Sequence, residues 1–205
     1  GRFAQEGRNG TFAVSVTEEV DPTLKSPKPK STVRLNEVEY ALYPLVIGKS
    51  DVDKSEPPRS GGLAMAFYHL HRFLTRSPKE FESDFHHMGN APVYVFPTDG
   101  SKPVDLKDTR VLCEVIRTEH GAIPCKWYFF KSDLNPQVKS GTYPDGALIA
   151  FETFISEHDQ DPCEVYFSDF KAADGRQLPH KIDVRYGDNH FGLLTVEKYT
   201  TKSAK

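Results

Sequence analysis

The sequence predicts an α+β fold in which a long, curled antiparallel β-sheet, a half-barrel of about nine strands, wraps around two adjacent helices. Short runs rich in valine, isoleucine, phenylalanine and tyrosine fill residues 91–200 and predict an antiparallel meander. Two helical patterns lie side by side in residues 60–89. The 205 residues are 38% hydrophobic and 27% charged, which is typical of a single domain over residues 1–205.

The region before the helices contains two strand patterns. Residues 1–10 are polar and predict a flexible N-terminus. Residues 11–17 alternate between apolar and polar side chains, as a half-buried strand does, and residues 33–47 resume strand character. Residues 21–31 contain three prolines and predict a connector between these strands, while the charged residues 49–59 predict a surface loop.

Both helices have recognisable signals. In the first, large apolar residues that include Phe67 and Leu70 recur at helical spacing, so they form a face that packs against the sheet. In the second, Ser77, Pro78 and Glu80 form a capping box, and Gly89 is placed to end the helix.

Seven strand patterns follow the helices, and turns rich in glycine, aspartate, asparagine and proline separate them. The run 148–155 is apolar at almost every position, which places it centrally in the sheet. Residues 201–205 predict a flexible tail. The strand patterns cover residues 93–96, 109–117, 123–130, 147–156, 164–170, 181–186 and 191–200.

Three cysteines fit no zinc-binding spacing. Cys113 and Cys125 lie on consecutive strand patterns and would face each other if the hairpin were centred on Glu119. A cross-strand disulfide, which would indicate an exported protein, and two free thiols packed as small hydrophobic side chains both fit this arrangement. Cys163 has no predicted partner.

Polar clusters offer little support for a metal or a catalytic centre. His69 and His71, and likewise His86 and His87, are spaced so that a helix directs them to different faces, which disfavours a common metal. The acidic run 157–161 lacks the glycine and the distal glutamate of a calcium loop. Nucleotide-binding and nucleophile motifs are absent from the sequence, so we predict no cofactor, no metal and no catalytic residue in this chain.

The charge is close to neutral overall but unevenly distributed. A net charge of −3 and a pI near 6.3 disfavour nucleic acid as a partner, and the sequence contains no apolar run long enough for a transmembrane helix. Residues 151–175 hold seven acidic residues and one lysine, a net charge of −6, whereas residues 176–205 hold six basic and three acidic residues, a net charge of +3. Cross-strand pairing between adjacent hairpins is the simplest explanation.

The last strand patterns carry a family resemblance. The run Leu178–Tyr186, followed by a turn and Gly192–Tyr199, resembles the half-barrel of bacterial lipoprotein carriers of the LolA and LolB type and of the RseB sensor domain. The runs 161–169 and 174–179 also resemble the tail of secreted bacterial proteins that carry a trypsin-like serine protease domain elsewhere. The first resemblance implies an envelope protein that binds an acyl chain or senses a protein partner.

We therefore expect a non-enzymatic module, periplasmic or secreted, that binds a lipid, a lipoprotein acyl chain or another apolar ligand in the concavity of the sheet. The alternatives are an accessory, non-catalytic domain of a secreted serine protease and a metal-dependent hydrolase that uses the histidine-rich helices. The predicted ligand-binding residues on the concave face are Phe67, Leu70, Trp127, Phe129, Phe151 and Phe154.

Overall fold

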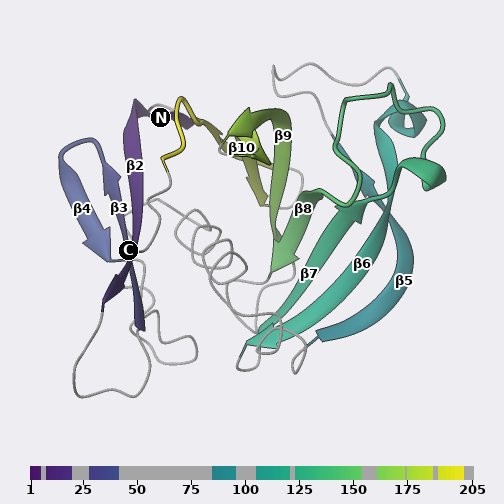
Figure 1. Ribbon diagram of the computed structural model, residues 1–205, viewed down its shortest axis with the longest axis horizontal. Coiled ribbons are helices and arrows are strands. Elements are labelled where there is room, and N and C mark those ends of the chain that lie inside the picture. The colour runs from purple at the N-terminus through teal and green to yellow at the C-terminus, as the bar shows by residue number, and fades with distance from the viewer. Residues whose placement is uncertain are drawn as a thin grey trace.

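Eleven antiparallel strands form one sheet in the residues that the computed structural model describes, which are 1–5, 8–19, 28–41, 85–95, 105–120, 123–153, 161–173, 175–186 and 189–200. Figure 1 shows their arrangement. The strands are β1 (Arg2–Gln5), β2 (Arg8–Glu19), β3 (Lys28–Leu35), β4 (Val38–Ala41), β5 (Phe85–Tyr94), β6 (Arg110–His120), β7 (Ile123–Phe130), β8 (Leu148–Thr153), β9 (Cys163–Ala173), β10 (Arg176–Tyr186) and β11 (Asn189–Thr195).

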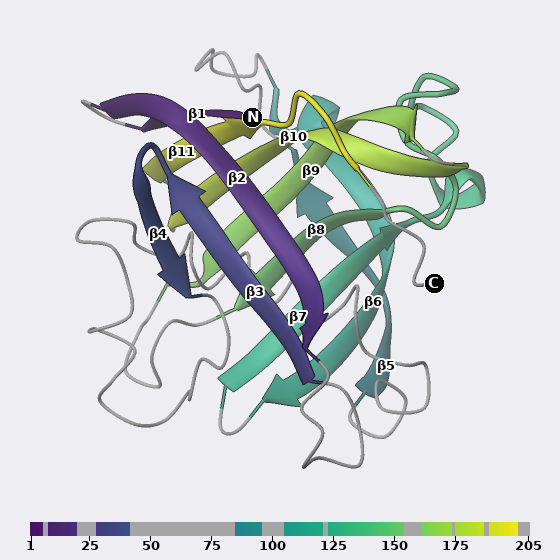
Figure 2. The same cartoon turned by 60° about the vertical axis from the view of Figure 1, so that its left-hand side comes forward.

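The strand order is β4-β3-β2-β1-β11-β10-β9-β8-β7-β6-β5. Strands β5 to β11 therefore pair in chain order as a meander that begins at Phe85, six residues before the predicted start. Strand β1 lies between β2 and β11 and pairs with both, so it joins the N-terminal strands to the last strand of the meander. Figure 2 shows this junction, with β2 and β3 running beside β1 and β11.

The predicted α+β class is wrong for the described residues, which contain no α-helix and only two short 3-10 turns, Leu106–Thr109 and Ser132–Leu134. Most of the predicted helix pair, residues 60–84, lies outside the described residues. Residues 85–89 begin strand β5, and a bulge between His87 and Gly89 interrupts the strand there. Because a bulge breaks the period of two, the spacing of the apolar residues resembles that of a helix.

The N-terminal residues also differ from the prediction. Residues 1–10 were expected to be flexible, yet they contain β1 and the start of β2. The sequence alone did not indicate this because Phe3 is the only large apolar residue of this segment, and a single apolar residue gives no alternation to detect. Tertiary pairing with β11 supplies the hydrogen bonds that keep this segment extended.

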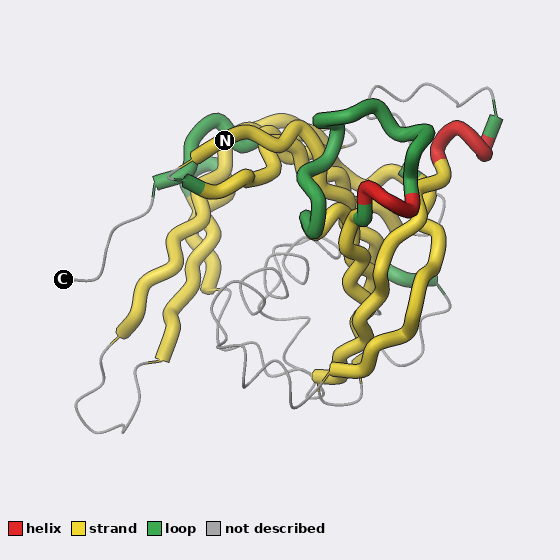
Figure 3. Tube along the Cα trace, turned by 45° about the vertical axis from the view of Figure 1, so that its right-hand side comes forward, coloured by secondary structure: helices red, strands yellow, loops and turns green. Residues whose placement is uncertain are grey.

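The sheet is strongly curved. Figure 3 shows an arch with the N-terminal strands on one side and β5 to β8 on the other. We call the concave side the inner face and the convex side the outer face. Each face carries its own hydrophobic cluster, and β8 is buried on both faces, which agrees with its predicted central place in the sheet.

The outer cluster packs under the loop 131–147. Val138 and Tyr143 of the loop contact buried side chains of β5 to β9. Asn135 holds the loop on the sheet: its Nδ2 donates to the carbonyls of Leu112 and Lys131 at 2.7 and 2.8 Å, and its Oδ1 accepts from the Leu112 amide at 2.8 Å. Because Asn135 is 2% exposed, these bonds satisfy an amide that would otherwise be costly to bury.

Of the two arrangements that the sequence left open for Cys113 and Cys125, the structure has the free thiols and not the disulfide. The strand register pairs His120 with Ile123, so Cys113 lies opposite Phe130 and Cys125 lies opposite Thr118. Cys113 consequently belongs to the outer cluster and Cys125 to the inner one. All three cysteines are free and buried, and burial raises the pKa of the Cys113 thiol to about 12.

Candidate functional site

One apolar residue from each of five neighbouring strands forms a continuous row on the inner face. The strands place these residues directly opposite one another, and four of the five are at most 1% exposed. We call this set the inner row: Ile116, Trp127, Phe151, Val165 and Val184.

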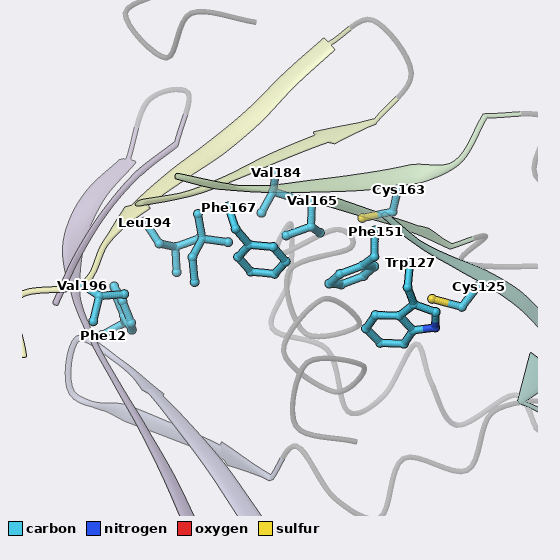
Figure 4. Packing of buried hydrophobic residues seen from close by; sticks show 11 residues of the cluster. Phe12, Cys125, Trp127, Phe151, Cys163, Val165, Phe167, Val184, Leu194 and Val196 are labelled. Carbon is cyan, nitrogen blue, oxygen red and sulfur yellow. The ribbon is translucent and has the colours of Figure 1, made fainter. Parts of the chain in front are cut away.

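Aromatic rings pack against one another on this face. The rings of Trp127 and Phe151 lie 5.1 Å apart between centroids, and those of Phe151 and Phe167 lie 5.9 Å apart, both in tilted arrangements that favour aromatic packing. Figure 4 shows these side chains pointing to the inside of the curve. The indole Nε1 of Trp127 donates to Thr118 Oγ1 at 2.9 Å, so its polar group is satisfied within the apolar surroundings.

The inner face becomes more exposed beyond the inner row, toward the C-terminal end of β7. Phe129 and Leu148 lie opposite each other there, are partly buried and pack against the inner cluster. A bulge between Tyr128 and Phe129 marks this point, where Ile149 and Ala150 both contact the outer cluster and Leu148 returns to the inner face. An accessible apolar surface thus continues the buried one.

Charged residues lie beside Phe129 and farther along the same face. Glu114 lies opposite Phe129, and its carboxylate lies 3.2 Å from His87 Nε2 and 3.5 Å from Lys131 Nζ. Arg110 lies opposite Tyr94, whose side chain is 41% exposed. We call the six residues at this end of the inner face the rim: Tyr94, Arg110, Glu114, Phe129, Lys131 and Leu148.

The outer face carries charged residues at the positions next to the inner row. As in the inner row, each of these residues lies directly opposite a residue of the same set on the neighbouring strand, from β6 to β10. We call this set the outer charged row: Arg117, Lys126, Glu152, Glu164 and Arg185. Glu164 and Arg185 lie directly opposite each other, in the register that cross-strand pairing of the two oppositely charged hairpins requires.

Two tyrosines support the glutamates of this row. Tyr128 Oη donates to Glu152 Oε2 at 3.0 Å, and Tyr166 Oη donates to Glu164 Oε1 at 3.0 Å. Lys126 forms an ion pair with the other oxygen of Glu152. Burial, with a smaller effect of the neighbouring carboxylates, raises the pKa of both tyrosines well above the ordinary value of 10. Both hydroxyls therefore remain donors over the physiological pH range.

Asp183 is the most buried charged group of the outer face, with 4% of its side chain exposed. Arg185 Nε lies 3.1 Å from one of its oxygens and His190 Nε2 lies 2.8 Å from the other. Arg185 is itself only 11% exposed, so this ion pair is shielded from solvent. Opposite charges thus face one another at Asp183, which suits structural support of the sheet.

The structure brings together three of the six predicted ligand-binding residues. Trp127, Phe129 and Phe151 all lie on the inner face. Phe67, Leu70 and Phe154 lie outside the described residues. Leu148 and Lys131 are not among the predicted residues, because a bulge and a loop boundary, which have no clear sequence pattern, set the direction of their side chains.

The histidine and acidic clusters contain no site in the described residues. His86 and His87 belong to strand β5 and lie opposite Arg117 and Ile116, which occupy different faces. No group of three histidine, cysteine, aspartate or glutamate side chains able to hold a metal occurs in the described ranges. His69, His71 and most of the acidic run 157–161 lie outside those ranges.

Comparisons with protein-family models, curated proteins and solved structures find no match for this chain. The resemblances to lipoprotein carriers and to protease-associated tails therefore stay predictions. No helix in the described part of the chain is long and apolar enough to cross a membrane.

Proposed function

We propose that this chain is a non-enzymatic binding module that holds an apolar ligand, such as an acyl chain, on the inner face of its curved sheet. The observation that carries the proposal is the continuity of the inner row with the rim. Buried rings give way to the partly exposed Phe129 and Leu148 without a polar residue between them on β7 or β8. An alkyl chain on these two side chains would extend an apolar surface that the fold has already built.

Two further points support an apolar ligand. The outer face, at adjacent positions of the same strands, is charged and internally paired, so the inner face is the one suited to apolar contacts. The resemblance of the last strands to lipoprotein carriers implies the same ligand class and an exported protein.

The expected affinity follows from the buried hydrocarbon. Each buried methylene contributes about 0.8 kcal/mol, so a ligand longer by two methylenes should bind roughly 10-fold more tightly while it still fits the rim. A ligand series of increasing chain length therefore measures how far the apolar surface extends.

Trp127 supplies the test, because it is the only tryptophan of the chain and lies two residues from Phe129 on the same face. A stearic acid that carries a nitroxide on its chain should quench Trp127 fluorescence at micromolar concentration. A small water-soluble nitroxide should not, because Trp127 is 1% exposed. Equal quenching by the two probes, or none by the labelled lipid, would contradict the proposal.

Two variants locate the ligand. Phe129→Glu places a charge at the rim and should abolish quenching by the labelled lipid. Lys126→Gln alters the opposite face of the same strand and should leave quenching unchanged. Circular dichroism of both variants establishes that the sheet is intact.

A further inference from the structure

The rim contains two cations on the same face as its apolar side chains. Lys131 follows β7 directly and has extended backbone angles, φ −126° and ψ 118°, so it continues the alternation of the strand. Phe130 points to the outer cluster, and Lys131 therefore lies on the inner side with Phe129. Its proximity to Glu114, 3.5 Å between Nζ and Oε2, agrees with this direction.

Arg110 is the second cation. It opens β6 opposite Tyr94, and the next residue, Val111, is buried in the outer cluster, so the alternation of the strand places Arg110 on the inner side. Its side chain is exposed, and it forms no ion pair with any residue in the described ranges. Arg110 is thus a charge on the apolar face without a counter-charge in the described structure.

The carboxylates nearby are already engaged. Glu114 contacts His87 through one oxygen and Lys131 through the other. Asp145, which also interacts with Lys131, accepts a hydrogen bond from the Ser132 amide at 2.8 Å, and this bond is the main cause that lowers its pKa. The pair of Lys131 and Glu114 is itself 38% exposed at both side chains, so water screens it and an incoming anion can replace it at small cost.

We infer that the apolar ligand carries an anionic head group, a carboxylate on a long alkyl chain, which Arg110 and Lys131 bind at the rim while the chain lies over Phe129 and Leu148. This inference rests on the proposed function. Charge-assisted hydrogen bonds from a guanidinium and an ammonium group suit a carboxylate, and the planar guanidinium can bind it through two nitrogens.

The same geometry predicts the orientation of the ligand. Lys131 and Trp127 are four residues apart on an extended segment, a separation of about 13 Å. The head group therefore lies away from Trp127, and the chain approaches it. A nitroxide in the middle of the alkyl chain should quench Trp127 more strongly than one next to the carboxylate.

The experiment compares a nitroxide-labelled stearic acid with its uncharged methyl ester, both titrated against Trp127 fluorescence in the full chain at low ionic strength. We expect the acid to bind about 10-fold more tightly than the ester. The double variant Arg110→Gln/Lys131→Gln should weaken binding of the acid by the same factor and leave the ester unchanged. The control Lys126→Gln, on the outer face, should alter neither.

The outcomes separate the two proposals. If neither the acid nor the ester quenches Trp127, the proposed apolar-ligand function fails. If both bind with equal affinity, or if the double variant keeps the full preference for the acid, the head-group inference is overturned while the apolar-ligand function stands. An unchanged near-ultraviolet circular dichroism spectrum for the double variant excludes misfolding as the cause of any loss.

Discussion

The inner row and the outer charged row occupy adjacent positions of the same five strands, yet they stabilise the sheet by different means. Trp127 is 1% exposed and packs against rings, while its neighbour Lys126 is 44% exposed and pairs with a carboxylate. Apolar burial does not depend on the direction of approach, whereas ion pairs depend on partners and on salt. The comparison teaches that, at these positions, the strand alternation separates side chains that stabilise the sheet by apolar burial from side chains that do so by charge pairing.

The largest expected effect comes from the inner row. Phe151→Ala removes a fully buried ring and both of its aromatic contacts, so the free energy of unfolding should fall by about 4 kcal/mol. Urea unfolding measures the change. The neighbouring substitution Glu152→Gln is the matched control and should cost much less. Equal losses for the two variants would contradict the distinction between the faces.

A smaller loss is expected at Asp183, where the outer face is most buried. Asp183→Asn keeps the side-chain shape but removes the charge that Arg185 and His190 face, so stability should fall by about 2 kcal/mol. The loss should persist in high salt, because shielded charges are screened little. Its disappearance in 1 M salt would mean that this ion pair behaves like an exposed one.

An effect of about 1 kcal/mol on the free energy of unfolding is expected from Tyr128 on the outer face, and it should depend on pH. The pKa of Tyr128 is raised in the folded state, so its contribution is complete below the ordinary value of 10 and is lost as the pH rises further. Unfolding of the wild type at alkaline pH should therefore become easier above pH 10. The variant Tyr128→Phe lacks the hydrogen bond to Glu152, so its free energy of unfolding near neutral pH should be about 1 kcal/mol lower than that of the wild type. Above pH 10 the free energy of unfolding of this variant should fall less steeply than that of the wild type.

The smallest effect is expected at Lys126, an exposed member of the outer charged row. Lys126→Gln breaks the ion pair with Glu152, but 44% of the lysine side chain is exposed, so the cost should stay below about 1 kcal/mol and vanish in high salt. Thermal unfolding at low and high ionic strength measures it. A loss as large as that of Phe151→Ala would show that the outer charged row stabilises the sheet as strongly as the inner row does.

Several features could be predicted from local patterns. The meander and the shared face of Trp127, Phe129 and Phe151 follow from the period of two, which is visible in the sequence. The helix over residues 85–89 was wrong because a bulge at Gly89 distorts that period. The disulfide required a hairpin centred on Glu119, and the observed register is shifted from it; this shift changes the partner of every residue in the hairpin.

The sequence by itself determined the period of two of the strands, and hence that Trp127 and Phe129 share one face of their strand while Tyr128 and Phe130 share the other. Only the tertiary structure decided the register that aligns Ile116 with Trp127 and Glu164 with Arg185, the insertion of β1 between β2 and β11, and the return of Leu148 to the inner face. The physical reason is that alternation is a local property of the chain. Register, strand order and bulges arise from hydrogen bonds and packing between residues far apart in the sequence.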